Sequence, residues 1–371
     1  MSKIRFIILL VLWILVIRNV LTVLLPGFPS LIQPNYDEDL YKRLEYLYDH
    51  SQYRQKNPTT LIPDNTLFRY AAGAYLKGVD PILINSEITP LGKYFIALSI
   101  FLFHNDSIVI VIFAGFTLVA LWLLSMSIIR DQVFAVIPLV LFSSEPLFLD
   151  QIRTAPNLDI VQLPFILLAL YLFIRSFKKN KFLLTSIAIG FVISTKSLVP
   201  GILLVLCFIV FLLTQRQVKS VLIFILSLPI AGLILILSYI KTFLDGYSLH
   251  AFLGFQKWIF LYQQSKLMYP FSVWRLILLN QWQTWWGDHR ILQSAEWQIT
   301  WPIFIFFWVC LLLLILFKKI FISKPCEILI VWSLVYFGFL SLGVISARFL
   351  LPVLPVVYVI GIYSVKKILF K

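Results

Sequence analysis

The sequence is poor in charged residues, and this scarcity excludes a soluble globular domain. Only 13% of its 371 residues are Asp, Glu, Lys or Arg, whereas 60% are hydrophobic. A water-soluble domain with so few charges could not cover its surface with polar groups. Several apolar runs are long enough to cross a bilayer. Because a helix satisfies its own backbone polar groups in lipid, the sequence predicts an all-α polytopic membrane protein.

Cysteine and histidine are also scarce. The three cysteines, Cys207, Cys310 and Cys326, lie in or beside apolar runs and are expected to be small core residues, not a disulfide framework. The four histidines show no metal-ligand spacing. Glycine-rich nucleotide motifs and the Gly-x-Ser-x-Gly pattern are absent from the sequence, which gives no support to a soluble nucleotide site or a serine hydrolase.

The positive charge is concentrated between the apolar runs. The net charge is +14, and basic clusters fall at Arg175–Lys181, Arg216–Lys219, Lys318–Lys324 and Lys366–Lys371. This distribution is typical of cytoplasmic loops under the positive-inside rule. It argues against nucleic acid as a partner, because the basic residues follow the membrane topology.

These charges predict a topology. Lys3 and Arg5 keep the N-terminus inside, and the run from Phe6 to about Leu25 is expected to be a retained first helix. Two segments, about 27–89 and 239–299, are then placed on the outer face. Further helices are predicted near 132–148, 160–175, 182–198, 200–214, 220–238, 300–317, 327–344 and 349–365.

Residues 90–129 leave the helix count open. They must cross the membrane an odd number of times, yet forty residues are long for one helix and tight for three. We therefore expect about 10–12 transmembrane helices in a single membrane domain over residues 1–371, with a cytoplasmic C-terminus and without a C-terminal soluble domain.

The two outer segments carry structural signals of their own. In the first, Leu40, Leu44 and Leu47 recur at helical spacing between charged residues, which predicts an amphipathic helix on the membrane surface. The second segment is rich in aromatic side chains that form either an interfacial belt or a wall for sugar or lipid. These are Trp258, Tyr262, Tyr269, Trp274, Trp282, Trp285, Trp286 and Trp297.

Two acidic sites at predicted helix starts are candidates for chemistry. Asn35 can cap a helix with Asp37 and Glu38 in its first turn. Asn157 can cap another with Asp159 in its first turn, one short loop after Asp150. Acidic residues at a helix start are favourable without any function. If the sites converge, one carboxylate could take a proton from an acceptor hydroxyl while another orients it.

Four cations at or near outer helix ends stand where the positive-inside rule makes positive charge unusual: Lys93, Arg153, Lys196 and Arg348. A cation partly in the membrane needs an anionic partner, a carboxylate or a phosphate. Each could instead reach up to lipid headgroups. Four such positions beside two acidic sites favour a phosphate-bearing substrate, whose leaving group fixed positive charge would stabilise.

The order of several short motifs resembles that of the protein O-mannosyltransferases and, more widely, of the bacterial aminoarabinose transferases of lipid A. These motifs, which span nearly the whole chain, are Tyr36-Asp37-Glu38, Gly78-Val79-Asp80-Pro81, Thr89-Pro90-Leu91-Gly92-Lys93, Arg153 to Asp159, Ser194-Thr195-Lys196 and Ala347 to Pro352. The resemblance departs at Ile88 and Thr89, where the mannosyltransferase family has a histidine and a proline.

The resemblance implies a GT-C-type helical bundle with amphipathic helices and a catalytic aspartate in the first outer loop. Asp37 matches that aspartate, with Glu38 beside it, and Asp159 matches a second acidic position. Lys93 and Arg348, with Lys196, are placed to meet a lipid phosphate. The implied reaction moves a sugar from a polyprenyl- or dolichyl-phosphate carrier to an acceptor hydroxyl with inversion, on the outer face of the cell membrane.

Other readings stay open at this stage. A transporter or flippase for a lipid-linked sugar also needs polar residues in a helical bundle, although the acids here lie at helix ends. A non-catalytic GT-C-like subunit would keep the fold without needing Asp37 and Asp159 together. Asp37, Glu38 and a nearby carboxylate could bind a divalent metal ion, so metal dependence is left open, as are the sugar and the acceptor.

Overall fold

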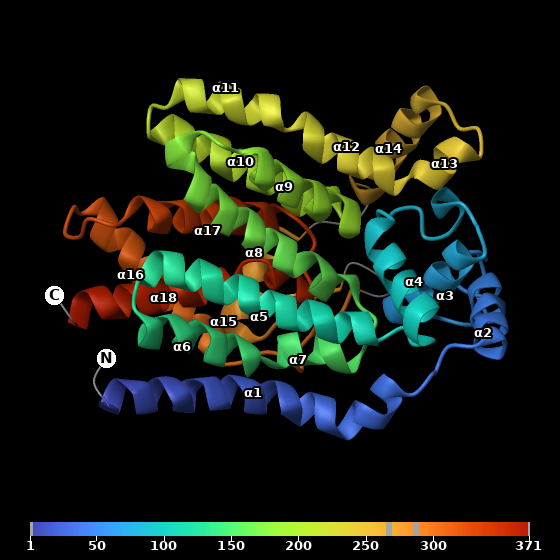
Figure 1. The fold of residues 1–371 in the computed structure, drawn as a ribbon, viewed down its shortest axis with the longest axis horizontal. Coiled ribbons are helices and arrows are strands. Elements are labelled where there is room, and N and C mark those ends of the chain that lie inside the picture. The colour runs from blue at the N-terminus through green and yellow to red at the C-terminus, as the bar shows by residue number, and fades with distance from the viewer. Residues whose placement is uncertain (1–2, 265–268, 285–288, 370–371) are drawn as a thin grey trace.

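The computed structural model describes residues 3–264, 269–284 and 289–369 of the chain, and they form a bundle of apolar helices (Figure 1). Trp285, Trp286 and Lys371, which the sequence analysis singled out, lie outside the described residues. The bundle confirms the predicted all-α fold: the described strands are only β1 (Trp282–Gln283) and β2 (Ile291–Leu292), two residues each and paired antiparallel.

Five segments of the described chain are long and apolar enough to cross a membrane. They belong to α1 (Lys3–Ile32), α5 (Ile108–Ile129), α8 (Leu158–Ser176) with η2 (Phe177–Lys179), α11 (Val218–Ser227) with α12 (Pro229–Ser238), and α17 (Lys324–Leu342). A sixth candidate is a pair bent by 57°, α6 (Gln132–Ser143) and α7 (Pro146–Arg153). Shorter apolar helices are α4 (Leu91–Phe103), α9 (Leu183–Thr195), α10 (Leu198–Thr214) and α16 (Thr300–Leu316). Helix α18 (Leu354–Leu369) ends the described chain.

Most of the two predicted outer segments lies at one end of the bundle, called here the loop end, whereas Ser272–Leu279 lies nearer the middle (Figure 1). The first contributes α2 (Glu38–Asp49), α3 (Asp64–Leu76) and η1 (Pro81–Leu83). The second contributes α13 (Ile240–Leu244), α14 (Leu249–Gln264) and α15 (Ser272–Leu279). Asp80 Oδ1 accepts a hydrogen bond from Thr242 Oγ1 at 2.7 Å, which ties the two segments together.

Both termini lie at the opposite end of the bundle (Figure 1). There Asp131 forms ion pairs with Arg5 near the N-terminus and, at 4.0 Å, with Lys366 near the C-terminus. Lys366 Nζ also donates to the carbonyl of Ile129 at 2.9 Å. The α10–α11 and α16–α17 connections, which carry two of the basic clusters, lie at this same end (Figure 1). The shared side predicted for the basic segments is therefore found in the fold.

The predicted amphipathic helix is α2, whose buried face consists of Tyr41, Leu44 and Tyr48. Its cap differs from the prediction, because Asp37 and not Asn35 is the N-cap: Asp37 Oδ1 accepts from the Leu40 backbone N–H at 2.7 Å. Asn35 instead uses its backbone N–H to bond the His104 carbonyl at 2.9 Å. The chain therefore enters α2 from beside the C-terminal end of α4.

Residues 90–129 form two helices, α4 and α5, and not three. Figure 1 shows α4 at the loop end with α2 and α3, whereas α5 runs the length of the bundle. The start of α4 packs closely on the end of α9: a Cβ on Gly92 would lie 2.4 Å from the Thr195 carbonyl oxygen. Only glycine allows this backbone approach, which brings the α9–α10 loop and its Lys196 against the start of α4.

A buried carboxylate lies at the bend between α6 and α7. Glu145 is fully buried, and its oxygens accept hydrogen bonds from Thr300 Oγ1 at 2.8 Å, from Trp301 Nε1 at 3.0 Å and from the Tyr358 hydroxyl. Pro146 opens α7 immediately afterwards. One side chain thus joins the α6–α7 bend to the start of α16 and to α18, and its lone pairs are satisfied in an apolar interior.

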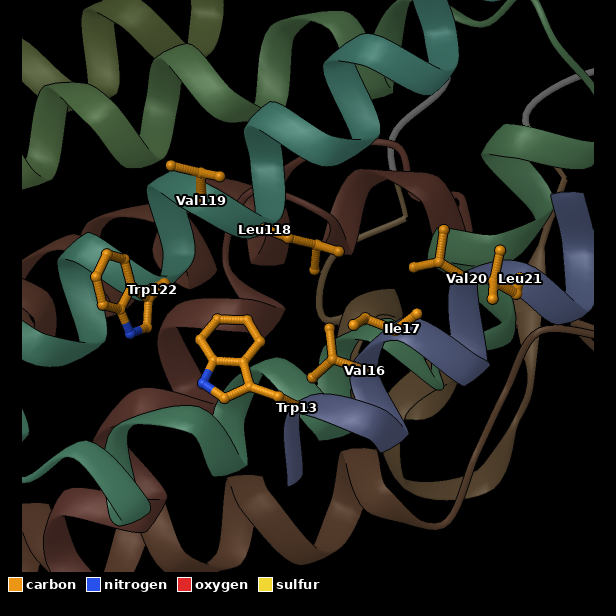
Figure 2. A pocket seen from close by; sticks show the side chains of 8 residues that line it. All are labelled: Trp13, Val16, Ile17, Val20, Leu21, Leu118, Val119 and Trp122. Atoms are coloured by element: carbon orange, nitrogen blue, oxygen red, sulfur yellow. The ribbon is translucent and has the colours of Figure 1, made fainter. Parts of the chain in front are cut away.

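An apolar cavity of about 290 Å³ lies between α1 and α5 (Figure 2). Trp13, Val16 and Val20 of α1 face Leu118 and Trp122 of α5 across it, and its walls expose no polar surface. The indole rings of Trp13 and Trp122 meet edge to face with centroids 6.3 Å apart. The surface that this cavity exposes is therefore hydrocarbon and aromatic.

Candidate active site

A polar cavity of about 590 Å³ lies at the loop end, where α3, α7, the α15–α16 connection and η3 (Ala347–Leu350) meet. Its charged lining residues are Asp64, Asp150, Glu296 and Arg348. Side-chain amides and an indole complete the polar part of its walls: Asn65, Gln151, Asn157, Gln293 and Trp282. Elements from both outer segments thus form one cavity between the helix ends.

Asp64 and Arg348 form an ion pair at the cavity wall. Arg348 Nη1 lies 2.6 Å from Asp64 Oδ2, and the Tyr53 hydroxyl donates to Asp64 Oδ1 at 3.3 Å. Burial alone would raise the pKa of the Asp64 carboxyl, but the charge and hydrogen bond of Arg348, with the charge of Lys196, hold that pKa below its ordinary value. Asp64 is therefore ionised at neutral pH.

A second pair, Lys196 and Asp159, lies next to the first. The Lys196 ammonium donates to Asp159 Oδ1, and the two side chains are only 13% and 10% exposed. Arg348 interacts electrostatically with both Asp159 and Lys196, so the two pairs form one cluster of two cations and two carboxylates. The structure therefore brings Lys196, Arg348 and Asp159 together beside Asp64.

Hydrogen bonds between elements hold this cluster in place. Asn65 Nδ2 donates to the Thr154 carbonyl at 3.1 Å, which joins the start of α3 to the end of α7. Gln162 Nε2 donates to the carbonyls of Val192 at 2.8 Å and Ser197 at 3.1 Å, which fixes the loop that carries Lys196. The charged groups are therefore positioned by the scaffold and not by their mutual attraction alone.

Asp37 and Glu38 lie apart from this cluster. Both are exposed; Asp37 caps α2, and Glu38 is paired with Lys77 at 2.7 Å. The Tyr36 N–H bonds the His104 carbonyl at 3.0 Å, at the far end of α4 from Lys93. The eleven residues from Lys93 to His104 span roughly 17 Å of helix. The structure therefore does not bring Asp37 to the cations with which the sequence analysis grouped it.

Lys93 and Arg153 also differ from the central pairs. Lys93 is fully buried, and its ammonium donates to the carbonyls of Asn85 at 2.8 Å and Ile88 at 2.9 Å. It thus closes the loop that leads into α4. Arg153 is exposed at the end of α7, one turn beyond Asp150, and does not belong to the cavity lining.

The aromatic segment separates into residues of different roles. Trp282 lines the cavity. Trp274 and Trp297 instead use their indole N–H groups for packing contacts. Trp274 joins α15 to α17 by donating to Ser341 Oγ, and Trp297 joins the turn before α16 to α15 by donating to the Ile277 carbonyl, each at 2.9 Å. Trp258 is 47% exposed on α14 and stacks on Tyr262. Part of the segment is therefore a cavity wall, and part of it is packing or exposed surface.

Sequence reasoning missed Asp64 and Glu296. Asp64 follows Pro63 at the first position of α3, the same local signal that drew attention to Asp37 and Asp159. The pattern alone could not rank one helix start above another. Glu296 lies in an irregular turn, and no periodicity there distinguishes it from a solvent-exposed acid.

Part of the sequence matches a known protein family. Residues 87–242 match the family described as dolichyl-phosphate-mannose-protein mannosyltransferase. This stretch contains Lys93, Arg153, Asp159 and Lys196, whereas Asp64 and Arg348 lie outside it. No curated protein matches the sequence.

Two solved structures of ArnT have a similar fold. ArnT from Cupriavidus metallidurans in the apo state matches with a TM-score of 0.57 and 16% identity, over 82% of this chain and 54% of that chain. ArnT from the same organism bound to undecaprenyl phosphate matches with a TM-score of 0.58 and 14% identity, over 95% of this chain and 60% of that one.

An archaeal structure is also similar. The oligosaccharyltransferase AglB from Archaeoglobus fulgidus, in complex with an inhibitory peptide and a dolichol-phosphate, matches with a TM-score of 0.51 and 12% identity over 99% of this chain. The chain spans 54%, 60% and 50% of the lengths of these three structures. ArnT and AglB share the GT-C fold. The chain is therefore a multi-pass membrane protein with the GT-C fold, as the resemblance of its motifs predicted.

Proposed function

We propose that the protein is a glycosyltransferase that moves a sugar from a polyprenyl-phosphate carrier to an acceptor hydroxyl. The observation that carries the proposal is the cluster of Arg348, Lys196, Asp64 and Asp159 beside the polar cavity. Two fixed cations match the charge of a lipid phosphate, and two carboxylates supply a proton acceptor beside them. The family match, and the undecaprenyl phosphate and dolichol-phosphate of the similar structures, support this donor class.

The site is proposed to act on the outer face of the membrane. The loop end carries the cavity, whereas the basic N-terminal and C-terminal residues Arg5 and Lys366 meet at the opposite end. The positive-inside rule assigns that opposite end to the cytoplasm. Because the cluster lies at the helix ends, the donor phosphate would stay at headgroup depth while its chain remains in the lipid.

The proposed mechanism uses the ion pairs as preformed phosphate ligands. A donor phosphate competes with Asp64 for Arg348 and with Asp159 for Lys196. Once Arg348 turns to the phosphate, the pKa of the Asp64 carboxyl rises, because its main stabilising charge is shared. The freed carboxylate becomes a better base for the proton of the acceptor hydroxyl.

The chemical step transfers the sugar from the phosphate oxygen to the acceptor oxygen. Asp64 accepts the proton of the acceptor hydroxyl, and the acceptor oxygen attacks the anomeric carbon from the face opposite the phosphate. The bond from the anomeric carbon to the phosphate oxygen breaks, and the configuration inverts. Arg348 and Lys196 stabilise the negative charge of the departing polyprenyl phosphate. Asp159 holds Lys196 in position for this step.

The resemblance of motifs assigns the base to Asp37, and the geometry favours Asp64. Asp64 lines the cavity and touches a cation, whereas Asp37 is an exposed helix cap at the far end of α4. A divalent metal ion remains a proposal without a site here, since no cluster of three or more His, Cys, Asp or Glu suited to a metal occurs within residues 3–264, 269–284 and 289–369.

The test is sugar transfer in sealed, right-side-out membrane vesicles supplied with radiolabelled polyprenyl-phosphate sugars. Arg348→Ala and Lys196→Ala are expected to lose transfer by roughly 100- to 1,000-fold, the scale for removing a fixed group that stabilises developing charge. Lys77→Ala is the matched control, because Lys77 is also paired with a carboxylate but lies away from the cavity.

This assay distinguishes a glycosyltransferase from a flippase. Transfer by wild type and Lys77→Ala, with loss in the two cation variants, supports the proposal. Movement of the labelled lipid across the membrane without transfer to any acceptor would favour a flippase. Full transfer by Arg348→Ala would remove the cluster from the mechanism.

A further inference from the structure

The charge on the cavity wall is mostly of one sign. Its lining has three carboxylates, Asp64, Asp150 and Glu296, and one cation, Arg348. Arg348 is already paired with Asp64 at 2.6 Å. Asp150 and Glu296 therefore remain as two carboxylates without a cation in the lining, although the chain as a whole carries a net charge of +14.

These two carboxylates come from different walls. Asp150 is on α7, and Glu296 is in the turn that leads to α16, where its Oε2 accepts a hydrogen bond from Ser294 Oγ. Arg153 partly offsets the charge of Asp150 from the exposed end of the same helix, outside the cavity lining. The negative potential between the walls is thus built by two separate elements, α7 and the turn before α16.

The rest of the lining suits uncharged hydroxyl groups. Gln151 is only 4% exposed, and its Oε1 has no hydrogen-bond partner among the residues that the structure describes. This carbonyl oxygen needs a donor, and a sugar hydroxyl supplies one. Asn157 and Gln293 add further amides, and Trp282 adds an aromatic surface against which a ring can pack.

We propose that this cavity selects the transferred sugar by charge: it accepts an uncharged, hydroxyl-bearing sugar and excludes one that carries a carboxylate, through Asp150 and Glu296. The inference rests on the proposed function. A sugar carboxylate between these side chains would face two like charges in a partly dehydrated cavity, a repulsive arrangement that discriminates against the wrong ligand. The selectivity is therefore located in residues separate from the phosphate-binding cations.

The experiment measures binding of three lipids to the purified protein in lipid nanodiscs: polyprenyl-phosphate glucose, polyprenyl-phosphate glucuronic acid and bare polyprenyl phosphate. The two sugars differ only at C6, which is a hydroxymethyl group in the first and a carboxylate in the second. Wild type is expected to bind the glucose lipid at least 100-fold more tightly than the glucuronic acid lipid. The bare phosphate reports the cation cluster without the sugar.

The variants are Glu296→Gln and the double variant Asp150→Asn with Glu296→Gln. Each keeps the shape of its side chain and removes its charge. Affinity for the glucuronic acid lipid should rise at least 10-fold in the double variant, and by less in Glu296→Gln, while the bare phosphate binds within a few-fold of wild type. Unchanged affinity for the bare lipid also shows that the variants are folded.

Equal binding of the two sugar lipids by wild type would overturn the inference and leave the proposed function intact. An unchanged ratio in both variants would overturn it as well, because the discrimination would then come from other residues. Failure of wild type to bind even bare polyprenyl phosphate would overturn the proposed function itself, and the inference with it.

Discussion

Asp37 and Asp64 both lie at the start of a helix at the loop end, but their surroundings differ. Asp37 begins α2 as an exposed cap, beside Glu38 and its exposed partner Lys77. Asp64 begins α3 at a cavity wall, hydrogen-bonded to Arg348 and Tyr53. The first arrangement is sufficiently explained by helix stability. The second places charges where the protein gains little stability from them, which is typical of a site shaped for a ligand.

The two sites also differ in the contacts that hold their residues in place. The cavity site depends on buried groups from several elements, including Glu145 and the close contact at Gly92. The Asp37 site depends on one helix start and on backbone bonds to His104. Variants that disturb the supporting contacts should therefore affect transfer through the cavity site and leave the start of α2 unchanged.

The largest effect is expected at Glu145. Glu145→Ala leaves the Trp301 indole N–H and the hydroxyls of Tyr358 and Thr300 without their partner in an apolar interior. We expect the free energy of unfolding to fall by about 3 kcal/mol, since each buried unsatisfied group costs about 1–3 kcal/mol. Thermal unfolding in detergent measures the change.

The matched control for that variant is Tyr358→Phe, which removes one donor and leaves Glu145 its other two. We expect a loss of about 1 kcal/mol. If Glu145→Ala were no more destabilising than Tyr358→Phe, the hydrogen bonds of the buried carboxylate would not be what holds α7, α16 and α18 together.

A smaller effect is expected at Gly92. Gly92→Ala would place a Cβ 2.4 Å from the Thr195 carbonyl oxygen, so the start of α4 must move away from the loop that carries Lys196. We expect a destabilisation of about 1–3 kcal/mol, the usual cost of overpacking, together with reduced transfer. Unfolding and transfer assays on the same preparation measure both.

Gly115→Ala provides the comparison, because Gly115 lies within α5 and a Cβ there has nothing within 4 Å. This variant should be neutral or stabilising by up to about 1 kcal/mol, since alanine is the better helix former. Equal behaviour of the two variants would show that the close contact between α4 and α9 is not needed.

The smallest effect concerns pH. The Tyr53 hydroxyl helps to lower the pKa of the Asp64 carboxyl, although burial and Arg348 have larger effects. Tyr53→Phe should therefore raise that pKa, so the acid limb of the pH profile of kcat/KM moves to higher pH, because more Asp64 is protonated at a given acidic pH. An unshifted acid limb would argue that a different carboxylate is the base.

Much of the fold could be predicted from the sequence, because apolar runs and basic clusters are local features with strong physical meaning in a membrane. The boundaries of α8 and α10 lie within a few residues of their predicted positions. The bend at Glu145 was not foreseen, because the predicted helix at 132–148 runs through it and its partners lie more than 150 residues away. The closeness of Gly92 to Thr195 is likewise a tertiary fact that periodicity cannot show.

The candidate site, like the fold, could be predicted only in part from the sequence. The unusual outer cations identified Lys196 and Arg348, because charge at a membrane boundary is costly wherever the chain folds. Choosing among the acids needed the fold, since Asp37, Asp64 and Asp159 all begin helices and only tertiary packing distinguishes them. Arg348 is 284 residues from Asp64, and this separation hid the pair from any local pattern.

The most direct test of this account compares Asp64→Asn with Asp37→Asn in one transfer assay, with saturating polyprenyl-phosphate sugar and with folding checked by thermal unfolding. We predict that Asp64→Asn lowers kcat by roughly 100-fold or more, on the scale of a lost general base. Asp37→Asn, whose side chain can still cap α2, should stay within a few-fold of wild type. The opposite result, with Asp37→Asn inactive and Asp64→Asn active, would contradict the account and return the base to the start of α2.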